Sequence, residues 1–169
     1  MLSAKTREAL NKHLNAEVYS SYLYLSMSAY FEALNLRGFG NWMRVQAQEE
    51  MVHAMKFYKW LVDQGARVLL QPLEGPPTEW KSPLEAFKAA LKHEQLITSK
   101  IHDLANKAVA EKDHATNVFL HWFVSEQVEE EATANEIVEK LKMIKDSGGG
   151  LLMLDHQMEK RTFSPPASE

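Results

Sequence analysis

The sequence contains no cysteine and no long apolar run, and each absence excludes a class of protein. Without cysteine in 169 residues, disulfides, iron–sulfur clusters and thiolate-ligated zinc sites are excluded. No stretch approaches the ~20 apolar residues of a membrane-spanning helix, and residues 1–30 lack the apolar core of a signal peptide. A net charge of −4 gives no electrostatic footprint for nucleic-acid binding. We therefore expect a cytoplasmic protein that binds neither membranes nor nucleic acid.

Glycine and proline are scarce, and the few that occur divide the chain into helices. The sequence has seven glycines and six prolines, and residues 1–37 and 41–64 contain neither. Gly38 and Gly40, between these stretches, predict a turn. Gly65, directly after the second stretch, predicts the end of a helix.

The second half of the chain follows the same logic. Ser82 and Pro83 are typical of a helix N-cap and first helical position. Residues 84–147 contain no glycine or proline and would span about 95 Å as one helix, so a turn is expected at the polar residues 111–114. Gly148–Gly150 would free a short apolar segment, and the tail from Thr162 is expected to be loose. The predicted helices cover about residues 4–34, 38–65, 82–111, 114–146 and 150–161.

Loop lengths predict how these helices are connected. The first and second helices, and the third and fourth, are joined by short connections and should form antiparallel hairpins. The connection between the second and third helices is about fifteen residues, long enough to run the length of the bundle. With 45% apolar and 25% charged residues, residues 1–169 fit one domain. The predicted fold is all-α: a four-helix bundle with a long crossover and a short C-terminal fifth helix.

A repeated spacing of acidic residues gives the strongest functional signal. Glu50 lies 33 positions after Glu17, and Gln127 lies 33 positions after Glu94. The second helix carries Glu50-x-x-His53, and at the matching place the fourth helix carries Gln127-x-x-Glu130. The chain therefore resembles two related helical halves. Four helices that meet at one layer of carboxylates and imidazole are typical of a di-iron site inside a helix bundle.

The helical stripes predict that these polar residues face the bundle core. On each helix the residues three and four apart form a stripe that is apolar at its ends and polar near its middle. A single helical Glu is usually solvated, and a lone His on an apolar face is usually a core residue. The joint pattern at matched depth in both halves outweighs these simpler interpretations. Buried carboxylates are costly unless they are paired or bind metal, and the stripes carry no basic residue. A multivalent cation is therefore predicted.

The types of ligand favour iron. One imidazole among carboxylates favours iron over zinc, magnesium or calcium. Glu50 lies centrally and is the candidate to bridge two ions, with Gln127 nearby as a hydrogen-bond donor. The ion without a histidine should bind more weakly. The first iron would take Glu17, Glu50 and His53, and the second would take Glu50, Glu94 and Glu130.

The residues around these ligands resemble a known family over essentially the whole chain. The segments 15–27 (NAEVYSSYLYLSM), 48–54 (QEEMVHA), His93-Glu94 and 122–131 (WFVSEQVEEE) are similar to those of non-haem ferritins of the bacterial or archaeal kind. The resemblance implies a ferritin-like fold and a 24-subunit homo-oligomeric shell. It implies that Fe(II) is oxidised by O₂ or H₂O₂ at an intrasubunit ferroxidase centre and stored inside the shell as ferric mineral.

The resemblance also implies roles outside the two-iron centre. It implies a third iron site, carried here by Glu49, Glu126, Glu129 and Glu130. Tyr24 and Trp122 match redox-active aromatic residues, with core packing as the alternative. The fifth helix would line the four-fold axis of the shell, or else cover its own subunit as a docked tail. Around the predicted turn between the third and fourth helices, Glu111, Asp113, His114 and His121 would line entry channels, or else would be ordinary solvated residues.

Several related proteins remain as alternatives. Met51 occupies the position through which bacterioferritins bind haem, but those proteins carry a second Glu-x-x-His where this chain has Gln127 and Glu130. We therefore expect no haem and interpret Met51 as a packing residue. Di-iron oxygenases normally carry both motifs, rubrerythrin needs cysteine, and DNA-coating mini-ferritins lack a fifth helix. From a different class, a metal-free helical interaction bundle also remains, and iron loading would distinguish it.

Overall fold

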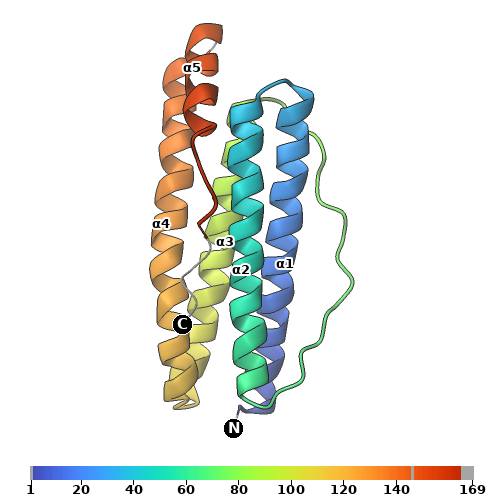
Figure 1. Cartoon of the computed structure of the whole chain (residues 1–169). Coiled ribbons are helices and arrows are strands. Elements are labelled where there is room, and N and C mark those ends of the chain that lie inside the picture. The colour runs from blue at the N-terminus through green and yellow to red at the C-terminus, as the bar shows by residue number, and fades with distance from the viewer. Residues whose placement is uncertain (1, 146, 165–169) are drawn as a thin grey trace.

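The computed structural model describes residues 2–145 and 147–164, and this part of the chain forms five α-helices and no strand. The predicted all-α fold class is confirmed, with four long helices side by side and a short fifth helix at one end (Figure 1). No helix in the described ranges is long and apolar enough to cross a membrane. The helices are α1 (Ala4–Ala33), α2 (Arg37–Asp63), α3 (Pro83–Ala110), α4 (His114–Ile144) and α5 (Gly148–Met158).

The connection between α2 and α3 runs along the outside of α1 for the length of the bundle (Figure 1). Side chains spaced along α1 hold its backbone. Asn11 Oδ1 accepts from the amide of Leu69 at 2.7 Å, and the Asn15 amide donates to the carbonyl of Leu69 at 2.9 Å. Further along, Ser26 donates to the Pro77 carbonyl at 2.7 Å. These hydrogen bonds hold the connection against α1. It runs outside the bundle, so the α1–α2 pair can pack against the α3–α4 pair.

Side-chain caps define where the helices begin. The hydroxyl of Ser3 accepts from the Thr6 amide at 3.0 Å, and Asp113 accepts from the Thr116 amide at 3.0 Å. The predicted start of α3 is confirmed, because Ser82 accepts from the Glu85 amide at 3.2 Å and a proline follows it directly. These caps satisfy backbone donors that the first turn of a helix leaves unpaired.

Two predictions made from glycine were wrong. Gly38 and Gly40 lie inside the first turn of α2, and the chain reverses before them, at Asn35 with φ 58°. A Cβ on Gly38 would lie 1.6 Å from the carbonyl oxygen of Asp155 in α5, so glycine permits a close helix contact there. Gly148–Gly150 form the first turn of α5, which begins two residues before the predicted start at about residue 150 and ends at Met158, three residues before the predicted end. The predicted end of the fourth helix at residue 146, and the tail at 165–169, lie outside the described residues.

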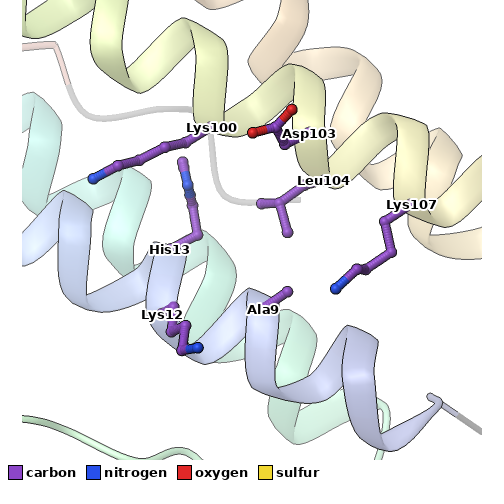
Figure 2. Close-up of a pocket in the computed structure, with 7 residues that line it drawn as sticks. All are labelled: Ala9, Lys12, His13, Lys100, Asp103, Leu104 and Lys107. Carbon is purple, nitrogen blue, oxygen red and sulfur yellow. The ribbon is translucent and has the colours of Figure 1, made fainter.

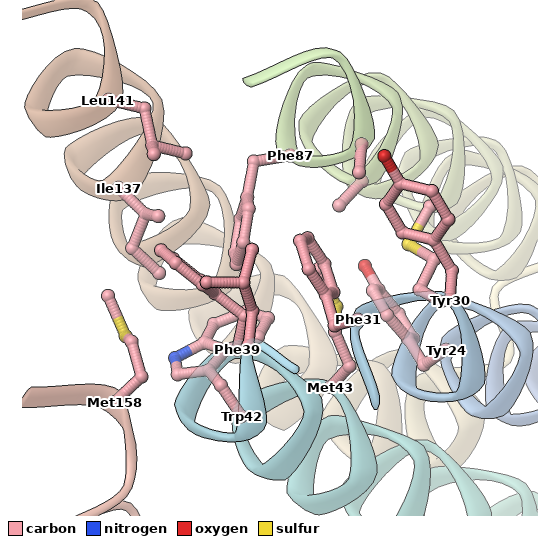
Figure 3. Close-up of a cluster of buried hydrophobic side chains, with 14 of the residues drawn as sticks. Tyr24, Tyr30, Phe31, Phe39, Trp42, Met43, Phe87, Ile137, Leu141 and Met158 are labelled. Carbon is pink, nitrogen blue, oxygen red and sulfur yellow. The ribbon is translucent and has the colours of Figure 1, made fainter. Parts of the chain in front are cut away.

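Two apolar clusters fill the bundle and leave a polar layer between them. The first contains Phe31, Phe39 and Phe87 and extends to Met158 of α5 (Figure 3). The second contains Leu14 and Phe57, among others, and lies towards the start of α1. Since apolar packing on both sides excludes water, any charged side chain in the layer between them lies in a poorly solvated environment.

Candidate metal centre

The polar layer consists of buried side chains from all four long helices. Their spacing of three or four residues within a helix directs them towards the same depth of the bundle. None is more than 8% exposed. The members are Glu17 from α1, Gln46, Glu50 and His53 from α2, Glu94 from α3, and Gln127 and Glu130 from α4.

One half of the layer already has the arrangement of a cation site. One ligand atom from each of Glu17, Glu50 and His53 lies within 4.8 Å of the others. His53 Nδ1 lies 3.4 Å from Glu50 Oε2. Glu17 Oε1 lies 2.7 Å from Nε2 of His13, whereas Glu17 Oε2 is buried and has no hydrogen-bond partner among the described residues. A buried carboxylate oxygen without a partner is costly, and a bound cation would satisfy it.

The other half of the layer is arranged differently. Glu130 comes within 4.8 Å of His53 and Glu126, by one ligand atom each. Glu94 belongs to neither grouping, and both its oxygens accept hydrogen bonds: the hydroxyl of Tyr24 donates to Oε1, and Gln127 Nε2 donates to Oε2 at 3.1 Å. The structure thus shows Gln127 as a hydrogen-bond donor to a predicted ligand.

Gln46 connects the two halves. Its Nε2 donates to Glu50 Oε1 at 2.9 Å and to Glu130 Oε2 at 2.7 Å, so one amide bridges two predicted ligands. Its Oε1 accepts from the guanidinium of Arg161 at 2.7 Å. No role was predicted for Gln46 from the sequence, although it lies four residues before Glu50 on the same helix.

Excess negative charge raises the proton affinity of the layer. Burial, together with the charges of Glu50 and Glu130, raises the pKa of Glu94 well above its usual value. Burial and the charge of Glu50 raise the pKa of Glu130 to about 8. For His53, burial lowers the pKa, but Glu50 and Glu17 outweigh it and raise the pKa to about 10. Without a metal ion, this part of the layer therefore holds protons at neutral pH.

Glu17 behaves in the opposite way. Burial alone would raise its pKa, but the imidazoles of His13 and His53 outweigh burial, and the net pKa is lowered. Glu17 is therefore ionised where Glu94 and Glu130 tend to be protonated. The spacing of four residues between His13 and Glu17 would have revealed this contact in the sequence, because side chains one helical turn apart are neighbours.

The predicted third-site residues are only partly brought together. Glu126 joins the grouping with His53 and Glu130. Glu49 is half-buried and pairs with Arg161, and Glu129 is exposed. Burial raises the pKa of Glu49, although Arg161 opposes that shift.

The remaining predicted residues have mixed environments. Tyr24 is buried beside Glu94, whereas Trp122 is 38% exposed, with its ring 5.4 Å from that of His53. Met51 is 41% exposed.

Around the turn between α3 and α4, two of the four predicted channel residues make structural contacts, one with α1 and one within α4. A carboxylate oxygen of Glu111 accepts from Thr6 Oγ1 at 2.6 Å, and Asp113 caps α4. His114 and His121 are exposed.

A surface pocket lies beside the layer, between α1 and α3 (Figure 2). Its volume is about 390 Å³, and the ring of His13 borders it. His13 therefore contacts both this pocket and Glu17, one of the predicted ligands. The pocket is lined by Ala9, Lys12, His13, Lys100, Asp103, Leu104 and Lys107.

Comparisons with known proteins agree over most of the chain. The ferritin-like domain family matches residues 7–144. A bacterial non-heme ferritin of Bacteroides fragilis (strain 638R) is 43% identical over 161 residues, 95% of this chain and 100% of that protein. A bacterial non-heme ferritin of Escherichia coli O157:H7 is 40% identical over 158 residues, 94% of this chain and 96% of that protein.

Solved structures give the same result. An engineered closed form of the Archaeoglobus fulgidus ferritin has a TM-score of 0.96 at 52% identity and covers 97% of this chain and all of that one. A structure of the open-pore ferritin from the same archaeon has a TM-score of 0.95 at 52% identity, over 96% of this chain and 100% of that chain.

Proposed function

Because this chain belongs to the ferritin family, and its function is iron storage, we propose that it oxidises Fe(II) at a di-iron centre in the polar layer of a single subunit. The proposed ligands are Glu17, Glu50 and His53 for the first iron, and Glu50, Glu94 and Glu130 for the second. Fe(II) is the substrate, O₂ or H₂O₂ is the oxidant, and the ferric product is stored as mineral.

The observation that carries this proposal is the grouping of Glu17, Glu50 and His53 around an unpartnered oxygen. The three ligand atoms lie within 4.8 Å of one another, and Glu17 Oε2 is buried without a partner. Carboxylate and imidazole donors suit iron. A set dominated by carboxylates favours Fe(III) over Fe(II), because the more highly charged ion gains more from anionic ligands. The layer therefore stabilises the product of oxidation.

The ligands of the second iron favour release of the oxidised iron from the centre. Its ligand set contains no histidine of its own, and Glu94 is already held by Tyr24 and Gln127. We propose that Glu126, with Glu49, Glu129 and Glu130, forms a third iron site on the way out of the centre. Tyr24, whose hydroxyl donates to Glu94, would be an electron donor beside the irons.

The assembly and surroundings are part of the same proposal. The solved relatives from A. fulgidus are described as a closed form and as an open-pore ferritin, which supports a hollow homo-oligomeric shell for this chain. The number of subunits proposed for it, 24, is the one that the resemblance to non-haem ferritins implies. The proposal includes no haem and places the protein in the cytoplasm.

Stopped-flow oxidation of Fe(II) tests the proposal. Glu50→Ala and His53→Ala should each lower the rate of the fast phase by about 100-fold or more, because each removes a ligand. Glu136→Ala is the matched control for the first, since Glu136 is exposed on α4 and pairs only with Lys140 among the described residues. His156→Ala, with a side chain 75% exposed, is the control for the second. Wild-type rates in the two ligand variants would show that the iron is oxidised elsewhere.

A further inference from the structure

The segment after α5 returns along α2 and places one cation beside the metal centre. Asp155 of α5 accepts from the amide of Phe39 at 2.9 Å, which fixes α5 to the start of α2. The side-chain amide of Asn41 donates to the carbonyls of Met158 at 3.3 Å and of Arg161 at 2.9 Å. The path of the chain as far as Arg161 is therefore determined by contacts with α2.

The guanidinium of Arg161 then contacts one face of α2 over two turns. It lies over the ring of Trp42, 4.3 Å from the ring centre, and donates to Gln46 Oε1 at 2.7 Å. The same nitrogen that contacts Gln46 also donates to Glu49 Oε2. The side chain of Arg161 is 21% exposed and that of Glu49 is 27% exposed, so their ion pair is partly shielded from water. A shielded, charge-assisted pair of this kind is stronger than one on the open surface.

The contact with Gln46 determines how that amide faces the centre. A guanidinium can only donate hydrogen bonds, so Gln46 must turn its oxygen towards Arg161. Its NH₂ group must then face Glu50 and Glu130, as observed at 2.9 and 2.7 Å. Arg161 therefore affects the position of two of the proposed iron ligands through the side chain of Gln46.

The contact with Glu49 has a different consequence. Of the proposed third-site residues, Glu126 and Glu130 group with His53, and Glu49 is directed instead to Arg161. We propose that Arg161 is a positioning residue that holds Glu49 in place of a third metal ion, so that an ion binding there must compete with the C-terminal segment. This inference rests on the proposed function.

Anaerobic titration of the assembled protein with Fe(II), measured by isothermal titration calorimetry, tests whether Arg161 and a third iron compete for Glu49. In Arg161→Gln the third equivalent of Fe(II) should bind about tenfold more tightly or better, because a competing charge-assisted contact is lost. Arg161→Lys keeps the charge and should stay near the wild type. Lys160→Gln is the matched control, since it removes the same charge from an exposed neighbour. Unchanged or weaker binding of the third equivalent in Arg161→Gln would overturn the inference. Tighter binding could not be caused by damaged packing, because such damage would only weaken the binding of iron.

Removing the partner carboxylate isolates the contact. In a Glu49→Gln background, Arg161→Gln should no longer tighten the binding of the third equivalent of Fe(II). If Arg161→Gln still tightens this binding, its effect does not pass through Glu49. The first two equivalents report on the proposed function separately. If they fail to bind to the wild type, the di-iron centre is wrong, whereas two bound ions with an unchanged third affect only the role of Arg161.

A second measurement uses the unmodified protein and does not depend on how variants fold. Amide hydrogen exchange is followed in residues 159–164 after two and after three equivalents of anaerobic Fe(II). Displacement of Arg161 should raise the exchange rate of this segment only at the third equivalent. Exchange that is the same at two and three equivalents would contradict the competition.

Discussion

Loading the centre with metal should release about two protons from each chain at pH 7. Ligands must be deprotonated before they bind a metal ion. The pKa of Glu130 is raised to about 8, so roughly 90% of this residue is protonated at pH 7. The pKa of His53 is raised to about 10, so this residue also holds a proton at pH 7. Glu17, with its lowered pKa, contributes none.

The number of protons should fall in a defined way as conditions change. At pH 9 Glu130 is mostly ionised before the metal arrives, so release should drop by about one proton per chain. Glu130→Gln removes the same proton and should lower release at pH 7 by about one or more. Glu136→Gln alters an exposed glutamate of the same helix and should leave release unchanged.

The protons can be counted directly under argon. Fe(II) is added anaerobically to weakly buffered protein, so that neither oxidation nor hydrolysis of ferric iron contributes, and a pH-stat measures the base consumed. Calorimetry in two buffers with different ionisation enthalpies gives an independent count. Release of less than one proton per chain at pH 7, or a value that does not change in Glu130→Gln, would refute the proposed charge state of the layer.

Three further predictions concern stability. The folded pKa of Glu130 (about 8) and of His53 (about 10) lies above the unfolded values of 4.5 and 6.5, so both contributions favour folding at low pH and are lost as pH rises. The Tm of the metal-free protein should therefore fall between pH 6.5 and 8, and metal loading should flatten this slope; a Tm that rises instead in differential scanning calorimetry would contradict it. Gly38→Ala should lower the Tm by displacing α5, because its Cβ would meet a backbone carbonyl at 1.6 Å, whereas Gly149→Ala, with open space around it, should not. Phe87→Ala should lower the free energy of unfolding by about 3–5 kcal/mol in denaturant titration, since its ring is fully buried in the first apolar cluster.

The sequence was sufficient for the parts of the site that depend on helical periodicity. Glu50 and His53 are three residues apart on α2, so any helix through them places both on one face. The structure brings these two together with Glu17, as the spacing indicated. The depth at which separate helices meet was also predictable, because the step of 33 residues recurs in both halves.

Features set by tertiary packing could not be predicted in this way. Gly38 was interpreted as a turn residue because glycine usually marks one, but its role depends on α5, which contacts it from more than a hundred residues away. Arg161 lies beyond the last helix, where no periodicity indicates a direction, and only the contacts of α5 with α2 bring it to Gln46. Both examples depend on where one helix docks on another, and local propensity carries no information about that.

The expected difference in affinity between the two proposed irons has two physical causes. From ligand types alone, the iron at Glu17 and His53 should bind more firmly, because its partner has no histidine. The charges add a second reason, since Glu17 is ionised and has a free oxygen. At the other position an incoming ion must remove the proton from Glu130 and separate Glu94 from its two donors. Removing the proton from Glu130 costs less as pH rises towards 8, whereas removing the proton from His53 at the first position costs less as pH rises towards 10. The two affinities should therefore strengthen over different ranges of pH, the second iron levelling off first with respect to Glu130.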